Sequence, residues 1–217
     1  MAVKQIQSIV KDHLAPEDTI LVHGTSVEAA LGLLREKKLT EKPFSYRPKK
    51  KHRGYLFFTA NVAQFTEHPF GAQFDQSYDW KRTFSSGAFS GRVNGICHYL
   101  ASRLGYYPEK VDELIIGYER FPRRDMPDWE KKALEELISE CERNHFSRAQ
   151  VMNIFREANT RKGVVLGVGK NIFELKLEGP KEEKHEVSIY LPEGLDIKYV
   201  CGIVPCGELE RNLLKHA

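Results

Sequence analysis

The stretch TILVHGTSVEAALGLL, residues 19–34, decides how the fold is built. Its first residues are apolar and β-branched, which predicts a short buried strand that ends at His23. Thr25 and Glu28 then have the spacing of a capping box, and apolar residues follow at helical intervals to about Lys38. A strand that leads directly into a capped helix places His23 at the end of an element, where functional side chains often lie.

Outward from this stretch, the sequence predicts strands at both ends of the chain and helices in the middle. Five further segments read as strands: YLFFTA, VVLGV, IFELKL, EVSIYL and YVCGIV. Helical periodicity is found over 3–14, 92–104, 129–141 and from Ser147 onward, whereas 69–91 shows no clear period. We expect an α+β fold with a single domain over 1–217 and a helical insert at about 92–160, not an alternating doubly wound sheet.

Composition excludes several classes of protein. The chain has 217 residues, 41% of them hydrophobic and 29% charged, which is typical of globular proteins and unlike collagen, coiled coils or disordered chains. Its 33 Lys and Arg residues against 30 Asp and Glu leave a net charge of only +3, so attraction of the whole surface to nucleic acid is not implied.

Neither the membrane nor a metal is indicated as a partner. No run approaches the roughly 20 apolar residues that span a bilayer, and charges interrupt the first 18 residues, so we expect a cytoplasmic protein; export as an effector without a signal peptide stays open. The spacing of Cys201 and Cys206 is not that of a zinc site. With Cys97 and Cys141 they are predicted to be buried thiols, and no metal site is expected.

Three segments, taken in order, resemble the ADP-ribosyltransferase superfamily, in its diphtheria-toxin and poly(ADP-ribose) polymerase branch with the His, Tyr and Glu motif. LVHGTSVEAALGLL is similar to the first motif, GYLFFTANVAQF to the second, and HEVSIYLPEGLDIKYVCGIV to the third. GVVLGVGKNIFELK is a looser match to the strand and hairpin before the third motif. The resemblance covers about 19–67 and 163–205, and it implies a split antiparallel β-sandwich that carries the central helical insert.

The resemblance also implies roles for the motif residues. Glu186 would be the catalytic carboxylate, stabilising positive charge that develops on the ribose of NAD as nicotinamide leaves. His23 would hold NAD by positioning it. Gly24 would let the backbone approach the carboxamide closely, and the Thr25 hydroxyl could contribute to binding, although helix capping explains Thr25 equally well.

The second motif departs from the family pattern. Phe57 stands where the family has the tyrosine that stacks on nicotinamide, so the stacking ring is kept and the hydroxyl is lost. Tyr55 lies two residues earlier on the same predicted strand, and it should face the same side and could supply a phenol. Phe57 therefore counts as a catalytic and binding candidate, and Tyr55 as a binding candidate.

The resemblance implies a mono-ADP-ribosyltransferase that transfers ADP-ribose from NAD to a macromolecule, with release of nicotinamide. A protein is the expected acceptor and a nucleic acid is the second choice. Two alternatives stay open: an NAD glycohydrolase, which uses water as the acceptor, and a catalytically degenerate module that binds NAD or nucleic acid.

A basic run, RPKKKHR at 47–53, lies between the first and second motifs. It reads as a solvated loop, as a clamp on the pyrophosphate of NAD, or as a nucleic-acid contact. The basic residues of this run are Arg47, Lys49, Lys50, Lys51 and Arg53.

Other catalytic motifs are weaker or missing from the sequence. Glu208 and Glu210 form the Glu-x-Glu pattern of arginine-specific transferases, but the other motifs of that branch are not found, so we expect both to be surface residues. No nucleophile elbow, P-loop or Rossmann fingerprint is present.

Overall fold

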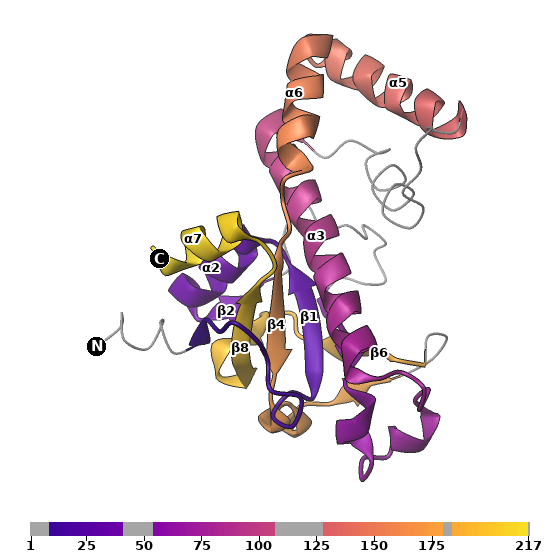
Figure 1. Ribbon diagram of the computed structural model, residues 1–217, viewed down its shortest axis with the longest axis vertical. Helices are drawn as coiled ribbons and strands as arrows, with labels where there is room; N and C mark the ends of the chain where they lie inside the picture. Colours follow the sequence, from indigo (N-terminus) through magenta and orange to yellow (C-terminus); the bar gives the residue numbers. More distant parts are fainter. Residues whose placement is uncertain (1–8, 41–53, 107–127, 180–183, 217) are drawn as a thin grey trace.

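The computed structural model describes residues 9–40, 54–106, 128–179 and 184–216, and it confirms the α+β class. Within these residues, five α-helices accompany a six-stranded antiparallel sheet and a two-stranded sheet (Figure 1). The helices are α2 (Val27–Glu36), α3 (Trp80–Leu104), α5 (Asp128–Arg143), α6 (Arg148–Ala158) and α7 (Glu208–Lys215). The strands are β1 (Leu21–Thr25), β2 (Lys38–Leu39), β3 (Tyr55–Ala60), β4 (Val164–Val168), β5 (Leu177–Glu178), β6 (Glu186–Tyr190), β7 (Leu195–Asp196) and β8 (Val200–Pro205).

The large sheet has the strand order β5-β6-β3-β1-β4-β8, and the small sheet pairs β2 with β7. Every neighbouring pair is antiparallel. Strands from the first third of the chain, β1 and β3, therefore lie at the centre, and strands from the last third lie on either side of them. The two ends of the sequence build one sheet together.

One face of the large sheet packs on α2 and α7. Alternate residues of β3 and β6 are buried there, with Phe58 opposite Val187 and Leu56 opposite Ile189. Leu33 from α2 and Leu214 from α7 belong to the same core. This alternation of buried and half-buried positions is the pattern of a strand with one covered face.

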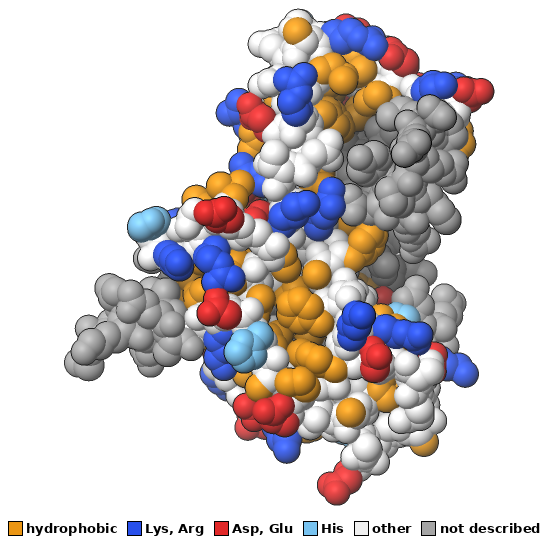
Figure 2. Space-filling model, in the orientation of Figure 1, with side chains coloured by type: hydrophobic (Ala, Val, Ile, Leu, Met, Phe, Trp, Pro, Cys, Tyr) orange, Lys and Arg blue, Asp and Glu red, His pale blue; other side chains and the backbone are white. Residues whose placement is uncertain are grey.

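Helix α3 lies along the other face of the sheet, beside β1 (Figure 1). A small apolar cluster, which includes Val22, Val165 and Val204, lies under its first turns. Figure 2 shows hydrophobic side chains gathered in the middle of this view, among scattered Lys, Arg, Asp and Glu side chains.

The expectation of an irregular stretch over 69–91 was wrong from residue 80 onward. Helix α3 begins after Asp79, whose side chain caps the helix by accepting from the Arg82 N–H, and it runs without a break to Leu104. Gly87 and Gly91 hide the helical period, because glycine is a poor helix former. A Cβ on Gly91 would come within 2.7 Å of the Val164 carbonyl oxygen in β4, and one on Gly87 would press on the side chains of Val22 and Val165.

The second half of α3, with α5 and α6, forms a helical arm, defined as residues 93–106 and 128–158. The arm extends away from the sheet (Figure 1). It has a hydrophobic core of its own, which includes Leu100, Leu137 and Val151 and shares no residue with the core under the sheet. Helix α6 begins after Ser147, as expected, and Ser147 forms a complete capping box with Gln150.

Several expected boundaries differ from the structure. The cap of α2 is Ser26, whose hydroxyl accepts from the Ala29 N–H, and Thr25 is the last residue of β1. IFELKL is not one strand, because its first residues form a 3₁₀ turn at Lys170–Glu174 and only Leu177–Glu178 pair in the sheet. Helix α7 was not expected.

Of the predicted opening helix over 3–14, residues 3–8 lie outside the described part of the chain, and the prediction was wrong for 10–14, which are not helical. Val10 instead forms a parallel bridge with Ile203. The four cysteines, all of which the structure describes, form no disulfide: Cys97 and Cys141 are buried as expected, whereas Cys201 and Cys206 are half-buried. None of the helices that the structure describes has both the length and the hydropathy of a membrane span.

Candidate functional site

The three sequence segments singled out above lie on three adjacent strands. His23 is in β1, Phe57 is in β3, and Glu186 is the first residue of β6, and these strands are neighbours in the order β6-β3-β1. The antiparallel register places Glu186 opposite Thr59, two residues from Phe57. Residues 163 positions apart in the sequence thus come within two strands of one another.

The pairing between β1 and β3 stops at the point where the site residues begin. It includes only Leu21↔Ala60 and Val22↔Thr59, and a continued ladder would bring Gly24 opposite Phe57. In its place, the Nδ1 of His23 lies 2.8 Å from the carbonyl oxygen of Phe57. We call this region, bounded by Gly24 on β1 and Phe57 on β3, the split.

The bond at the split determines the protonation of His23. A carbonyl oxygen can only accept, so Nδ1 carries the proton and donates it to Phe57. Burial lowers the pKa of His23 below its ordinary value, and the bond to the Phe57 carbonyl only partly opposes this shift. The imidazole is therefore neutral at pH 7, and its Nε2 has a lone pair with which to accept a hydrogen bond from a ligand.

Beyond the split, β3 and β6 present a face on which every side chain is at least partly exposed. We call it the open face. In the antiparallel register, side chains of directly opposite residues in β3 and β6 lie on the same side of the sheet. Tyr190 is 56% exposed, and the other five side chains of this face are half-buried. The open face consists of Tyr55, Phe57, Thr59, Glu186, Ser188 and Tyr190.

The open face combines aromatic rings with a carboxylate. The rings of Tyr55 and Tyr190 lie 5.1 Å apart, tilted by 50°. Tyr55 shares this face with Phe57, which agrees with the strand alternation expected from the sequence. Planar rings near a half-buried carboxylate suit a ligand with an aromatic ring that carries or develops positive charge.

His23 and Glu186 come from opposite faces of the sheet. By alternation, His23 belongs to the face of Phe58, and the two rings lie 5.4 Å apart, whereas Glu186 belongs to the open face. On β3, the imidazole therefore lies against the ring of Phe58 and bonds to the main chain of Phe57. At the split, a side chain of one face thus bonds to the main chain of Phe57, whose own side chain lies on the other face.

Gly24 borders the split, and the structure gives its missing side chain a packing reason. A Cβ built on Gly24 would come closer than 3.0 Å to the backbone of Gly87 and Gly91 in α3. The Gly24 carbonyl accepts a hydrogen bond from the side-chain amide of Asn94, also in α3, at 3.0 Å. Thr25, the next residue, is buried.

Sequence reasoning missed the residues of α3 and of the segment before it that border these strands. The Thr59 hydroxyl donates to the Ser86 hydroxyl at 3.2 Å, which ties the open face to α3. Tyr78 stacks on His185, the residue before Glu186, with ring centroids 4.2 Å apart and nearly parallel planes. The only sequence signal was the spacing of small residues, Gly87 and Gly91, in a segment without obvious period.

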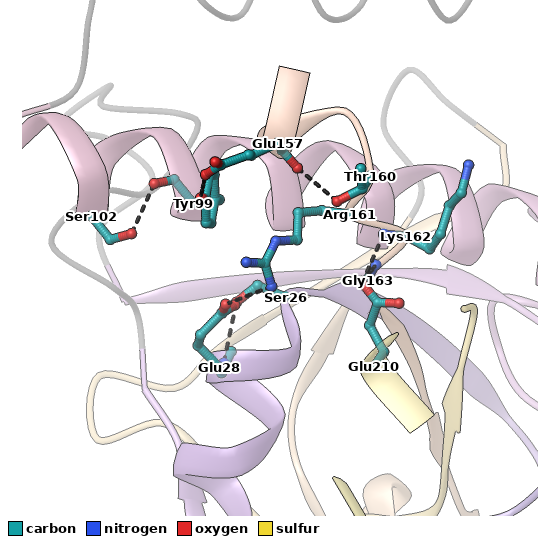
Figure 3. A network of polar contacts seen from close by, with 11 residues as sticks. Ser26, Glu28, Tyr99, Ser102, Glu157, Thr160, Arg161, Lys162, Gly163 and Glu210 are labelled. Atoms are coloured by element: carbon teal, nitrogen blue, oxygen red, sulfur yellow. Dashed lines mark hydrogen bonds and ion pairs between the residues drawn. The ribbon is translucent and has the colours of Figure 1, made fainter. Parts of the chain in front are cut away.

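The expectation that both glutamates of the Glu-x-Glu pattern lie on the surface was wrong for Glu210. Glu208 is exposed, but Glu210 is 1% exposed. Its Oε1 accepts from the backbone N–H groups of Lys162 at 2.8 Å and Gly163 at 3.3 Å (Figure 3). Helix α7 places Glu210 where it ties down the turn that leads into β4, far along the sheet from β6.

The basic run and the metal ligands are the two remaining expectations from the sequence. The basic run Arg47, Lys49, Lys50, Lys51 and Arg53 lies outside them. Within them, no group of three or more His, Cys, Asp or Glu side chains is arranged to hold a metal ion.

Comparisons of the chain with models of known protein families, with curated proteins and with solved structures find no match.

Proposed function

We propose that the protein is a mono-ADP-ribosyltransferase that takes ADP-ribose from NAD, releases nicotinamide and modifies a protein acceptor. The observation that carries this proposal is the bond between the His23 imidazole and the Phe57 carbonyl at the split. It links the first two motif segments on neighbouring strands, and the third strand adds Glu186 to the same open face as Phe57. The strand order and the split also support an ADP-ribosyltransferase-like split sandwich as the finer fold class.

Glu186 has the role that the reaction requires of a carboxylate. Cleavage of the bond between ribose and nicotinamide leaves positive charge on the ribose, and a fixed carboxylate stabilises this charge more in the transition state than in bound NAD. Glu186 is half-buried at the start of a strand whose main chain pairs with β3 on one side and β5 on the other. The paired main chain fixes where the Glu186 side chain leaves the sheet.

His23 and Phe57 fit the task of holding the donor. The neutral imidazole, with its proton on Nδ1, offers Nε2 to a ribose hydroxyl, and this contact needs no proton transfer. Phe57 offers a ring face for stacking on the positively charged nicotinamide, and Tyr55 on the same face brings a phenol.

The proposal is tested with NAD labelled in the adenosine part, incubated with the protein and candidate acceptor proteins. We expect label on the acceptor, release of nicotinamide, and a loss of both by at least about 100-fold in Glu186→Gln, because a charged group that stabilises a transition state contributes on that scale. Glu208→Gln is the matched control, since Glu208 is exposed on α7 and should leave both rates unchanged.

Two other outcomes have a defined meaning. Nicotinamide release that depends on Glu186 but leaves no label on protein or nucleic acid would replace transfer by hydrolysis, with water as the acceptor. No release in the wild-type protein, or equal release in Glu186→Gln and wild type, would contradict the proposed catalytic role.

A further inference from the structure

The split leaves two backbone carbonyls without the partners that a continued ladder would supply. The Asn61 N–H donates to the Ile20 carbonyl at 2.9 Å, and in a regular strand the carbonyls of Val22 and Gly24 then point toward β3 as well. In a continued ladder, Gly24 and Phe57 would form the next pair and would each accept from the other's N–H.

Each of these carbonyls accepts from a side chain. The Phe57 carbonyl accepts from His23 Nδ1 at 2.8 Å, and the Gly24 carbonyl accepts from Asn94 Nδ2 at 3.0 Å. His23 thus satisfies the β3 side of the split and Asn94 satisfies the β1 side. A buried carbonyl without a donor is costly. Because these two side chains supply the donors, β1 and β3 need not pair here to satisfy the two carbonyls.

We propose that Asn94 is a positioning residue that holds the β1 side of the split apart from β3, as His23 does on the β3 side. Its function at the site rests on the proposed use of the split to bind NAD, whereas its effect on β1 does not. Asn94 acts through the Gly24 peptide and is not itself required to touch the substrate.

The backbone of α3 fixes Asn94 in register with Gly24. Gly87, Gly91 and Asn94 are spaced to lie on one face of the helix, and the two glycines let the helix axis approach β1 closely. Asn94 follows Gly91 by one turn, which brings its amide to the carbonyl at the end of the close contact. A longer distance between helix and strand would put this carbonyl out of reach of the asparagine side chain.

A polar network around Arg161 also connects α3 to the start of α2, the helix that follows β1. Arg161 lies over the ring of Tyr99 in α3, 4.3 Å from its centroid, and pairs with Glu28 in the first turn of α2 at 3.8 Å (Figure 3). The Tyr99 hydroxyl donates to Glu157 of α6. The network thus links α3 and α6 to the start of α2, which begins shortly after Gly24.

The test compares two asparagines that make the same kind of bond. Asn94→Asp replaces the amide donor by a carboxylate of similar shape, which repels the Gly24 carbonyl. Asn144→Asp does the same to an exposed bond, Asn144 Nδ2 to the Glu140 carbonyl at 2.9 Å, in the arm. Asn94→Gln keeps the donor and serves as the conservative rescue.

The first readout is amide hydrogen exchange without any ligand. The Thr25 N–H belongs to the same peptide as the Gly24 carbonyl and lies in the ladder with β4. We expect it to exchange about tenfold faster in Asn94→Asp than in wild type, unchanged in Asn144→Asp and partly restored in Asn94→Gln. Equal exchange in Asn94→Asp and Asn144→Asp would overturn the proposal, whether or not the protein uses NAD.

The second readout is kinetic. We expect the KM for NAD to rise about tenfold in Asn94→Asp while kcat falls less than about threefold, because the residue shapes the site without taking part in the chemistry. Faster exchange of Thr25 with an unchanged KM would remove Asn94 from the NAD site. A wild-type protein without NAD turnover would contradict the proposed function, and the exchange readout would then decide the role of Asn94 alone.

Discussion

The six-stranded sheet and the helical arm each bury an apolar core, and the two cores differ in how they relate to function. The core under the sheet supports strands whose other face is left partly open, with Phe57 and Glu186 on it. The arm closes its core among its own helices. Next to their boundary, the Gly163 backbone packs closely on Gly91, and the network around Arg161 links Tyr99 of the arm to Glu28 of α2. The site is thus built by the sheet, and α3 connects it to the arm.

The largest effect is expected where the two regions meet. Gly163 has φ of +67°, and a Cβ there would come closer than 3.0 Å to the Gly91 backbone. Gly163→Ala should lower the free energy of unfolding by about 3–6 kcal/mol, because it adds a backbone clash to a strained backbone conformation. Gly32→Ala is the control, since it has open space in the interior of α2 and should stabilise by up to about 1 kcal/mol. Chemical denaturation measures both, and similar values would contradict the packing described.

A somewhat smaller effect is expected inside the arm. Leu137 is fully buried in α5, and Leu137→Ala should cost about 3 kcal/mol. Because the arm has its own core, the faster amide exchange should be confined to α5 and α6, with β1 and β4 unchanged. Met152→Ala, at a position 40% exposed, should change little. Equal loss of protection in the sheet would show that the two cores unfold as one.

A further prediction concerns buried Glu210, which bonds to the turn at Lys162 and Gly163 between the arm and β4. Glu210→Gln replaces a carboxylate that accepts from two backbone N–H groups by a neutral amide, and it should lower the free energy of unfolding by about 2 kcal/mol. Nicotinamide release by the folded protein should not change, because Glu210 lies away from the open face. Loss of release at full stability would move the catalytic glutamate to α7 and disprove the assignment to Glu186.

The smallest effect is a change in the pH dependence of stability. The pKa of His23 is lowered by burial in the folded state, so the unfolded chain takes up the proton first as the pH falls below about 6.5. The stability contributed by neutral His23 is therefore lost with falling pH. Unfolding measured against pH should give a shallower slope in His23→Gln than in wild type, while His68, whose pKa burial also lowers, contributes equally to both. Parallel slopes would show that His23 is not buried as described.

Much of the sheet could be predicted from the sequence, because runs of apolar, β-branched and aromatic residues are a local signal of strands. YLFFTA is such a run, although its sequence does not show that only Leu56, Phe58 and Ala60 are buried. That His23, Phe57 and Glu186 would lie on neighbouring strands could be expected only from the resemblance to a family, since the pairing of strands distant in sequence has no local signature.

The start of α3 and the roles of Glu210 and Asn94 could not be predicted, because they depend on contacts between residues distant in the sequence. The first turns of α3 contain Ser and Gly in place of strong helix formers, and tertiary packing on β1 overrides their low propensity. Glu210 looked like a surface residue because its partners are backbone N–H groups, which no sequence pattern reveals. Asn94 was missed for the same reason, as its partner is the Gly24 carbonyl.

We propose that NAD binds at the split and the open face of the sheet and not on the arm. This proposal is tested most directly by titrating NAD into isotopically labelled protein and following the backbone amide signals. The account predicts shifts concentrated at His23–Thr25, at Tyr55–Thr59 and at Glu186–Ser188, with α5 and α6 unaffected. No shifts, or shifts confined to the arm, would contradict it.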